Sequence, residues 1–284
     1  MSVRPRFTIV TPNFNMGDYL EETMISVLNN MSDGDEYYII DGGSSDKSIE
    51  IINKYASRIS GWISEPDHGY ADAIAKGFAS GAGEYLCWIN SGDLLLKGAL
   101  NKAKNLLDET GADMIFGDDL YINSSSLVIS FSRGHCRDLR KAMIYGDWTP
   151  LQDACFWRRV VYDRVGGIDT FIKNAADYDL FARISCDGKA IYAPFTFSAF
   201  RSHDGQRSIK NKISYKAEKE KSRKILVAKA RDPKFLKLLY RLFYFFLMRW
   251  RARVLHRYWD ISRLHNLDAR TLICREYKKG DQLG

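Results

Sequence analysis

Short apolar runs alternate with amphipathic segments through the first half of the chain. The apolar runs are typical of buried strands and occupy residues 7–11, 37–41, 61–64, 84–90 and 113–116. Between them, apolar residues recur at helical spacing, which predicts helices over residues 18–30, 45–55, 70–80 and 97–109. This alternation predicts an α/β fold, with a mostly parallel sheet covered by helices on both faces. Ligands of such sheets bind at the carboxyl ends of the strands.

The pattern changes after residue 205, where helical sequence rich in Lys and Arg takes over from strand-like runs. We therefore expect an α/β domain over residues 1–205 and a basic amphipathic helical extension over residues 206–284. The formal charge separates the same two parts. The whole chain carries +7, but residues 201–284 hold 23 basic and 8 acidic side chains, net +15, which leaves −8 for residues 1–200. An acidic body thus carries a basic extension.

The most basic stretch, residues 233–259, is also rich in aromatic and aliphatic side chains. Its longest uninterrupted apolar run, residues 242–248, is too short to cross a bilayer. Apolar bulk flanked by cations suits a helix that lies in the plane of an anionic membrane, where each cation contributes about 1 kcal/mol. Two alternatives stay open: a helix that packs its apolar face on the α/β domain, and a nucleic-acid surface, although no recognised nucleic-acid-binding module accompanies it.

The cysteines are odd in number and widely spaced: Cys87, Cys136, Cys155, Cys186 and Cys274. They indicate neither a disulfide framework nor a zinc site. No segment resembles a signal peptide or a membrane-spanning helix. We therefore expect a cytoplasmic protein that attaches peripherally to the inner face of the cell membrane.

Polar and acidic residues follow each of the first four predicted strands. The chain reads Thr-Pro-Asn-Phe-Asn at 11–15, Asp-Gly-Gly-Ser-Ser-Asp at 41–46, Glu-Pro-Asp at 65–67 and Asn-Ser-Gly-Asp at 90–93. A carboxylate at a strand tip can bind a ribose or base, and the next helix N-terminus offers amide donors to phosphate. Helix capping explains any one of these residues, but four such tips on one edge indicate a shared site.

The common nucleotide motifs are missing from this sequence. The Gly-Ala-Gly at 81–83 precedes a strand instead of following one, which is the wrong context for a dinucleotide fingerprint. No Walker-type loop occurs. A dehydrogenase or a P-loop NTPase is therefore disfavoured.

Two acidic positions are candidates for chemistry. Asp93 closes a short turn after a buried strand, where oxygen ligands suit a hard divalent cation that grips a diphosphate. Asp118 and Asp119, which follow the end of the strand predicted over residues 113–116, are rivals for that cation. Turn capping is the alternative for both positions. Asp177 lies in the first turn of a predicted helix, where it either complements the helix dipole or acts as a general base toward a hydroxyl group.

Together these motifs resemble family-2 glycosyltransferases of the GT-A fold, and bacterial enzymes of surface-polysaccharide synthesis in particular. The resemblance covers about residues 5–205 and includes Asp-Ala-x-x-Lys-Gly at 72–77, Gly-Gly-x-Asp at 166–169 and Asp-Tyr-Asp-Leu at 177–180. It implies inverting transfer of a sugar from a nucleotide diphosphate sugar to a hydroxyl of a saccharide acceptor, with Mg²⁺ or Mn²⁺ as cofactor. We expect that acceptor to be lipid-linked.

The resemblance also implies roles for individual residues. Asp177 matches the catalytic base, Asp93 matches a carboxylate of the metal motif, and His203 matches a histidine that closes the metal site. The residues that would border the base, ribose, diphosphate or donor sugar are Pro12, Asn15, Asp41, Glu65, Asp67, Asp72, Lys76 and Asn90. Gly92 stands where the metal motif usually carries a carboxylate, which predicts weak cation binding or partial independence of metal.

Two other functions stay open. A nucleotidyltransferase on a similar scaffold would carry a basic, Gly-rich phosphate loop near residue 12, and residues 11–17 contain no basic side chain. An inactive scaffold in a polysaccharide-assembly complex is favoured by Gly92. The sequence specifies neither the donor's base and sugar nor the acceptor.

Overall fold

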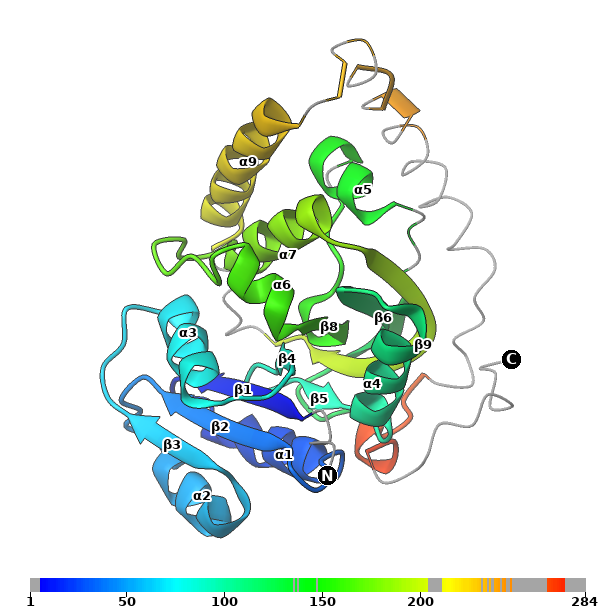
Figure 1. Cartoon of the computed structure of the whole chain (residues 1–284). Coiled ribbons are helices and arrows are strands. Elements are labelled where there is room, and N and C mark those ends of the chain that lie inside the picture. Colours follow the sequence, from blue (N-terminus) through cyan, green and yellow to red (C-terminus); the bar gives the residue numbers. More distant parts are fainter. Residues whose placement is uncertain are drawn as a thin grey trace, which may run out of the picture.

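The computed structural model describes residues 6–134, 136, 138–146, 148–203, 211–230, 232–233, 235, 238–240, 242–243, 246 and 265–273. Their strands form one mixed sheet between two layers of helices (Figure 1). The strands are β1 (Phe7–Asn13), β2 (Glu36–Asp41), β3 (Gly61–Ser64), β4 (Tyr85–Trp88), β5 (Leu94–Leu95), β6 (Met114–Ile122), β7 (Val128–Ser132), β8 (Cys155–Arg158) and β9 (Ala190–Arg201). The α-helices are α1 (Gly17–Leu28), α2 (Ser48–Tyr55), α3 (Tyr70–Ser80), α4 (Ala99–Thr110), α5 (Leu139–Gly146), α6 (Arg159–Arg164), α7 (Ala176–Asp187) and α9 (Lys212–Lys229).

The strands β3, β2, β1 and β4 form a parallel half of the sheet. Their register sets Asn13 beside Asp41 and Asp41 beside Ser64, so the polar ends of three strands lie in one row. The predicted meeting of these strand tips at one sheet edge is therefore confirmed, as are the strands and helices predicted up to residue 116, with shifts of a few residues at their ends.

The other half of the sheet is mixed. Strand β8 runs antiparallel between β4 and β6, whereas β9 returns parallel to β6. The short strands β5 and β7 pair antiparallel with β9 and β6. The prediction that Asp118 and Asp119 follow the end of a strand is wrong, because β6 continues through both to Ile122. Pairing with β7 and β9 satisfies the backbone of this polar stretch and extends the strand.

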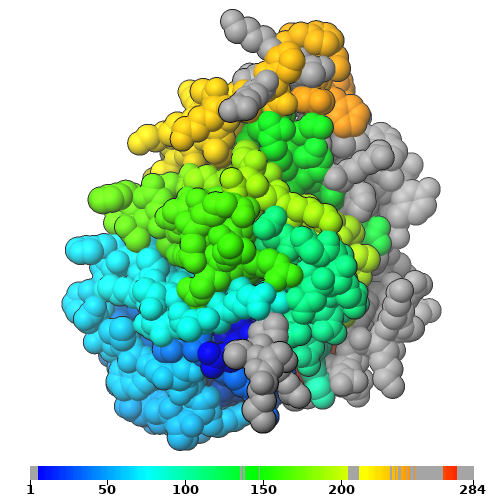
Figure 2. All heavy atoms as spheres, viewed as in Figure 1, coloured from blue at the N-terminus to red at the C-terminus, as the bar shows by residue number. Residues whose placement is uncertain are grey.

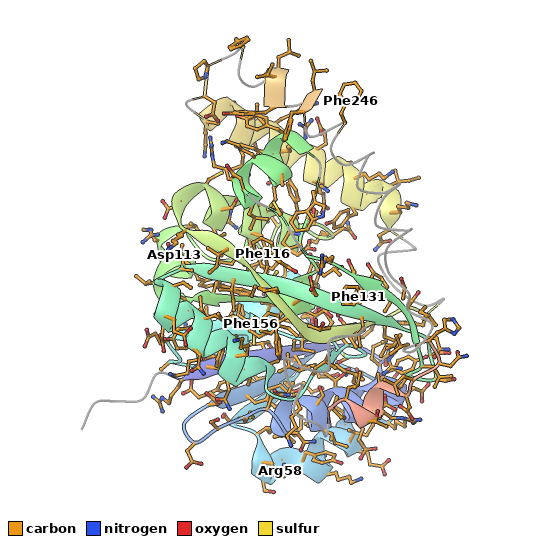
Figure 3. The ribbon with its side chains drawn as sticks, turned by 90° about the vertical axis from the view of Figure 1, so that its right-hand side faces the viewer. Arg58, Asp113, Phe116, Phe131, Phe156 and Phe246 are labelled. Carbon is orange, nitrogen blue, oxygen red and sulfur yellow. The ribbon has the colours of Figure 1, made fainter. Side chains whose placement is uncertain are left out.

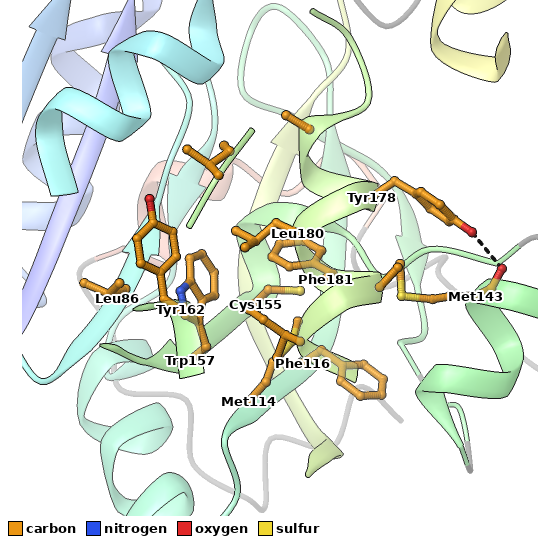
Figure 4. Close-up of a cluster of buried hydrophobic side chains, with 14 of the residues drawn as sticks. Leu86, Met114, Phe116, Met143, Cys155, Trp157, Tyr162, Tyr178, Leu180 and Phe181 are labelled. Atoms are coloured by element: carbon orange, nitrogen blue, oxygen red, sulfur yellow. Dashed lines mark hydrogen bonds between the residues drawn. The ribbon is translucent and has the colours of Figure 1, made fainter. Parts of the chain in front are cut away.

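The two helical layers cover opposite faces of the sheet. Helices α3, α5 and α7 pack on the face that carries Val10, and α1, α2 and α4 pack on the face that carries Ile9. Figure 4 shows part of the first core, where Tyr178 donates a hydrogen bond to the Met143 carbonyl across 3.0 Å. Gly77 lets α3 approach β1, since a Cβ at this position would lie 2.4 Å from Val10 Cγ1.

Two segments beyond residue 205 also pack on this body. Helix α9 contacts α7 and α5, so residues 212–229 are integral to it. Residues 265–273 follow the edge strand β7, where Val128 donates to the Leu267 carbonyl and accepts from the Asn266 amide. The predicted boundary at residue 205 and most of the basic stretch 233–259 lie outside the described residues.

The space-filling view places α9 (yellow) and the described residues of 232–246 (orange) at the end of the molecule opposite β2 and β3 (Figure 2). Figure 3 shows the same separation, with Phe246 at one end and Arg58 at the other. Among the described residues, no helix is long and apolar enough to span a membrane.

Candidate active site

The carboxylate of Asp41 joins the tips of β1, β2 and β3. It is fully buried and accepts hydrogen bonds from Asn13 Nδ2 (2.7 Å), Ser64 Oγ (2.7 Å) and Ser44 Oγ (2.5 Å), and from the backbone amides of Gly43 and Ser44. Burial alone raises the pKa of Asp41, but the hydrogen bonds from Ser44, Ser64 and Asn13 outweigh it and hold the pKa below its ordinary value. Asp41 therefore organises this edge as a charged, saturated acceptor, and its predicted contact with a nucleoside stays a prediction.

Side chains also tie the loop after β1 to the loop after β2. Asn15 lies in the left-handed backbone region, at φ 50°, and its Oδ1 accepts from the Ser45 amide. Asp46 accepts from the Gly17 amide across 2.8 Å and so satisfies the start of α1. Asn13 Oδ1 is enclosed and has no hydrogen-bond partner among the described residues. The described residues therefore leave one buried acceptor unsatisfied at this edge.

The predicted donor residues after β3 form a partly exposed charged group. Lys76 Nζ lies 2.8 Å from Glu65 Oε1 and 3.4 Å from Asp72 Oδ2. The hydrogen bond with Glu65 raises the pKa of Lys76. Asp67 accepts from the Gly69 amide, and its Oδ2 would lie 2.8 Å from a Cβ at Gly42, so it borders the Asp41 loop. These four side chains therefore line the same edge as Asp41.

The turn that carries Asp93 is held on several sides. Asn90 Nδ2 donates to Asp93 Oδ2 (3.2 Å) and to Gln152 Oε1 (2.8 Å). The amide of Arg201 donates to Asp93 Oδ1 across 3.0 Å. Ser91 Oγ donates to the Pro12 carbonyl across 3.2 Å, which connects this turn to the tip of β1.

Arg201, the last residue of β9, braces this turn with its side chain as well. Its guanidinium is only 1 % exposed and donates to the Gly92 carbonyl (2.7 Å) and to Glu22 (2.8 Å). It also lies 4.7 Å from the centre of the Tyr19 ring. A buried guanidinium with this many acceptors fixes the positions of the groups that it binds.

Asp93 belongs to a set of three buried carboxyl groups with Asp119 and Asp153. Burial, together with the neighbouring charge of Asp153, raises the pKa of Asp93 and of Asp119 well above the ordinary value. Burial raises the pKa of Asp153 to about 6. Ser198 Oγ donates to Asp119 across 3.0 Å. Asp118 is separate from this set, since it accepts hydrogen bonds from Tyr192 and the Gly134 amide.

The residues present do not complete a metal site by themselves. In the described part of the chain, no group of three or more His, Cys, Asp or Glu side chains is placed to hold a metal ion. Both oxygens of Asp93 already accept hydrogen bonds, and His203 lies against Tyr19, with ring centroids 5.3 Å apart. Gly92 has φ 116°, a conformation that L-residues rarely adopt, so a carboxylate there would require a different turn. A metal role for Asp93 and His203 stays a prediction.

Asp177 occupies the first turn of α7, as the sequence predicts. Its Oδ1 is enclosed and accepts no hydrogen bond from the described residues. Burial raises the pKa of Asp177 to about 6, against the lowering effect of the positive charge of Lys219. A carboxylate with this pKa is mostly ionised at pH 7 and has an oxygen ready to accept a proton, which are the properties of a general base.

Contacts across the fold bring the start of α7 toward the strand tips. Tyr70, the first residue of α3, donates to the Asn174 carbonyl and accepts from the Ala176 amide across 2.8 Å. Lys173 Nζ donates to the His68 carbonyl in the loop after β3. The thiol of Cys155 lies within electrostatic range of both Asp177 and Asp153. The predicted base and the buried carboxyl set therefore lie at the same end of the sheet.

Several residues that shape this site carry no signal in the sequence. Gln152 and Asp153 follow Leu151 and belong to no recognisable motif, and Arg201 ends a mostly apolar run. Their roles arise from long-range packing, since Arg201 meets Glu22 from a distant part of the chain. Only Asn13 could have been selected from its position at a strand tip.

The chain belongs to glycosyl transferase family 2, because the model of that family matches residues 8–166, more than half of the sequence. A Haemophilus influenzae protein named as an uncharacterized glycosyltransferase is 31% identical over 131 residues, which are 44% of this chain and 52% of that protein. The chain thus matches about half the length of that relative. A PGL/p-HBAD biosynthesis glycosyltransferase of Mycobacterium tuberculosis (strain H37Ra) is 23% identical over 184 residues, 63% of this chain and 69% of its own.

Solved structures agree on the fold. S. aureus TarS 1-349 in complex with UDP-GlcNAc has a TM-score of 0.64 at 14% identity, with 83% of this chain and 70% of that chain covered. The Pyrobaculum calidifontis mannosyltransferase PcManGT, in complex with GDP-Man and Mn²⁺, has a TM-score of 0.59 at 18% identity, with 84% and 69% covered. The chain therefore has a GT-A-like fold, as predicted. Asp177 and His203 lie beyond the region that the family model matches.

Replacing Asp41 by Asn is expected to destabilise the fold by about 2–3 kcal/mol at pH 7, because buried donors lose their charged acceptor. The pKa of Asp41 is lower in the folded state, so its ionised form contributes stability above the unfolded pKa, about 3.9. That contribution is lost as the pH falls through the folded pKa. Urea unfolding should therefore show a gap between wild type and Asp41→Asn that narrows below about pH 4. Ser45→Ala, in the exposed part of the same loop, is the control; a gap that does not change with pH would contradict this role.

Proposed function

We propose that this chain is an inverting glycosyltransferase, which moves a sugar from a nucleotide diphosphate sugar to a hydroxyl group of a saccharide acceptor. The observation that carries the proposal is Asp177, a carboxylate with an enclosed, unpartnered oxygen and a pKa of about 6 at the end of the sheet where ligands bind. Membership of glycosyl transferase family 2 supports the reaction class.

The proposed reaction is a single displacement. Asp177 accepts the proton of the acceptor hydroxyl, and the hydroxyl oxygen forms a bond with the anomeric carbon of the donor sugar. The bond between that carbon and the diphosphate oxygen breaks, and the nucleoside diphosphate leaves with the electron pair. Attack from the side opposite the leaving group inverts the anomeric centre. A base with a pKa close to the working pH suits this proton transfer.

We assign the donor to the edge formed by the tips of β1 to β4. Two structures with this fold hold nucleotide sugars, UDP-GlcNAc in TarS and GDP-Man in the mannosyltransferase, which supports the assignment. The unpartnered Asn13 Oδ1 adds an acceptor for a base or ribose. The residues proposed to border the donor are Pro12, Asn15, Asp41, Glu65, Asp67, Asp72, Lys76 and Asn90.

Thermal-shift measurements with UDP, GDP, TDP and CMP, each with and without Mn²⁺, would identify the donor nucleotide. Product analysis with the matching sugar donors then separates the three functions considered. Sugar transfer supports the proposal, whereas release of pyrophosphate from a nucleoside triphosphate and a sugar phosphate indicates a nucleotidyltransferase. Nucleotide binding without transfer or donor hydrolysis indicates an inactive scaffold.

Replacing Asp177 by Asn is expected to lower kcat for transfer on the order of 10²–10⁴-fold, because the amide cannot accept the proton. Donor affinity, measured by calorimetry, should stay within about twofold, since the donor residues lie on other elements. In the wild type, kcat should fall as the pH drops through about 6, where Asp177 becomes protonated.

The matched control is Asp187→Asn at the far end of α7, where the carboxylate pairs with Arg164 at the surface. This variant should transfer at the wild-type rate. Normal turnover by Asp177→Asn would show that another group acts as the base.

Weak dependence on a divalent cation is expected, because Gly92 removes a carboxylate and both oxygens of Asp93 are hydrogen-bonded in the protein. We propose that any Mg²⁺ or Mn²⁺ is held mainly by the donor diphosphate, with Asp93 and His203 as protein ligands. Excess EDTA should therefore leave a measurable part of the transfer rate, and Mn²⁺ should restore the remainder. Complete loss of transfer in EDTA would contradict weak dependence, and full retention would indicate independence of metal.

We further propose that the extension docks on an anionic membrane, which would bring the protein to a lipid-linked acceptor. Four apolar side chains of this segment are at least 49% exposed and recur at helical spacing, so they share one face: Phe235, Leu239, Leu242 and Phe246. On another side of this segment, Tyr240 packs on α5, with its ring centroid 5.5 Å from that of Tyr145. Lys234, Lys237 and Arg241 lie between these apolar positions in the sequence, as an anionic surface requires.

The double variant Phe235→Ala and Phe246→Ala is expected to bind vesicles with anionic lipid at least about tenfold more weakly than wild type, because each ring contributes apolar burial. Cosedimentation measures this loss, and wild type should not bind neutral vesicles. Phe171→Ala is the matched control, since Phe171 is exposed but lies outside the segment. Unchanged binding by the double variant would refute this surface. Deletion of residues 233–284 is a poorer test, because residues 265–273 pack on the body.

A further inference from the structure

Helix α9 supplies an N-terminal cap that α7 lacks. The residue before α7, Ala175, has no side chain that could bond the free amides of the first turn. Glu218 of α9 instead binds the amides of residues 173–175, which come just before that turn, and we call this contact the Glu218 cap. Its Oε2 accepts from the backbone amides of Asn174 (2.7 Å) and Ala175 (3.0 Å), and its Oε1 accepts from the Lys173 amide (3.3 Å) and the Asn174 side chain (3.2 Å).

A negative charge is well placed at this point. The N-terminus of a helix carries a partial positive charge, and a carboxylate beside it complements that charge. An ordinary cap comes from the residue next to the helix, whereas this one comes from a helix more than 40 residues further along the chain. The start of α7 is therefore fixed relative to α9 as well as to Tyr70 of α3.

The same face of α9 makes further contacts with the first turns of α7. Ser222 donates a hydrogen bond to Asp179, and Lys219 Nζ lies 4.9 Å from the centre of the Tyr178 ring. Tyr215 lies within electrostatic range of Asp177. Positions 215, 218, 219 and 222 follow helical spacing, so one stripe of α9 covers the turn that carries the proposed base.

We propose that Glu218 is a positioning residue for Asp177: its carboxylate holds the segment that leads into α7 and thereby keeps the partly buried Asp177 in a fixed position. This inference rests on the proposed function for its catalytic consequence, while the cap itself is a separate, testable contact. The part of the chain beyond the family match is then required for the chemistry as well as for docking.

Hydrogen exchange of the full-length protein tests the cap without any transfer assay. Glu218→Ala should speed exchange of the amides of residues 174–180 by about tenfold, because caps of this kind shift local opening by that order. Glu218→Gln keeps one acceptor oxygen and should give an intermediate increase. Glu220→Gln is the matched control, since Glu220 pairs with Arg223 on the same helix and should leave these amides at the wild-type rate.

Steady-state kinetics test the consequence for catalysis. Glu218→Ala should lower kcat at least about tenfold, with the KM of the donor within about twofold, because the donor residues lie on other elements. In Glu218→Ala, the fall of kcat on the acid side should occur below pH 6. Better hydration of Asp177 in this variant returns its pKa toward the ordinary value. The titratable groups that face Asp177 are Lys219 and Tyr215 on α9 and Cys155 on β8, and the variants change none of them.

The outcomes separate the two ideas. Unchanged exchange in Glu218→Ala overturns the cap. A loss of kcat with an unchanged pH dependence overturns the positioning role for Asp177, because it would reflect general loosening of the fold. If Glu218→Ala raises exchange locally but the wild type transfers no sugar from any donor, the proposed function fails and the structural role of Glu218 stands. Faster local exchange together with partial rescue by Glu218→Gln and a shifted pH dependence supports the inference.

Discussion

The buried charge of Asp41 is the constraint that shapes the ligand-binding edge. An ionised carboxyl group removed from water must be matched by donors, and Asp41 obtains them from the tips of β1 and β3 and from the loop after β2. Each of these hydrogen bonds requires a fixed distance, so the three segments are held in place relative to one another. Asn15 and Asp46 fix the loops after these strands, because each side chain accepts a hydrogen bond from a backbone amide of the other loop or of the helix that follows it.

A second buried charge performs the same task on the other side of the edge. Arg201 is the last residue of β9, and its guanidinium holds the turn at Gly92 by donating a hydrogen bond to the Gly92 carbonyl. Hydrogen bonds with Arg201 and Thr23 therefore fix the shape of this turn. This arrangement is consistent with the loss of an acidic side chain at Gly92, since the shape of the turn depends on Arg201 and Thr23.

Local patterns predicted the parallel half of the fold well. Strands such as β1 and β2 are short apolar runs followed by helices with their own periodicity, so neighbours in sequence are neighbours in space. The mixed half was not predictable in the same way, because β8 inserts between β4 and β6 from a distant point of the chain. The site follows the same division: Asp41 and Asp177 stand out by position, whereas Arg201, Asp153 and Glu218 acquire their roles only through packing between remote segments.

The pairing of residues 265–273 with β7 changes the status of the stretch that precedes them. A segment attached to the body at one end only would let the body rotate freely relative to whatever the segment binds. Here α9 and residues 265–273 both pack on the body, so the chain is fixed to it at two points. The described residues of 235–246 lie between these two points in the sequence, so a surface that binds them would set the angle of the whole molecule, and with it the direction in which the first turn of α7 faces.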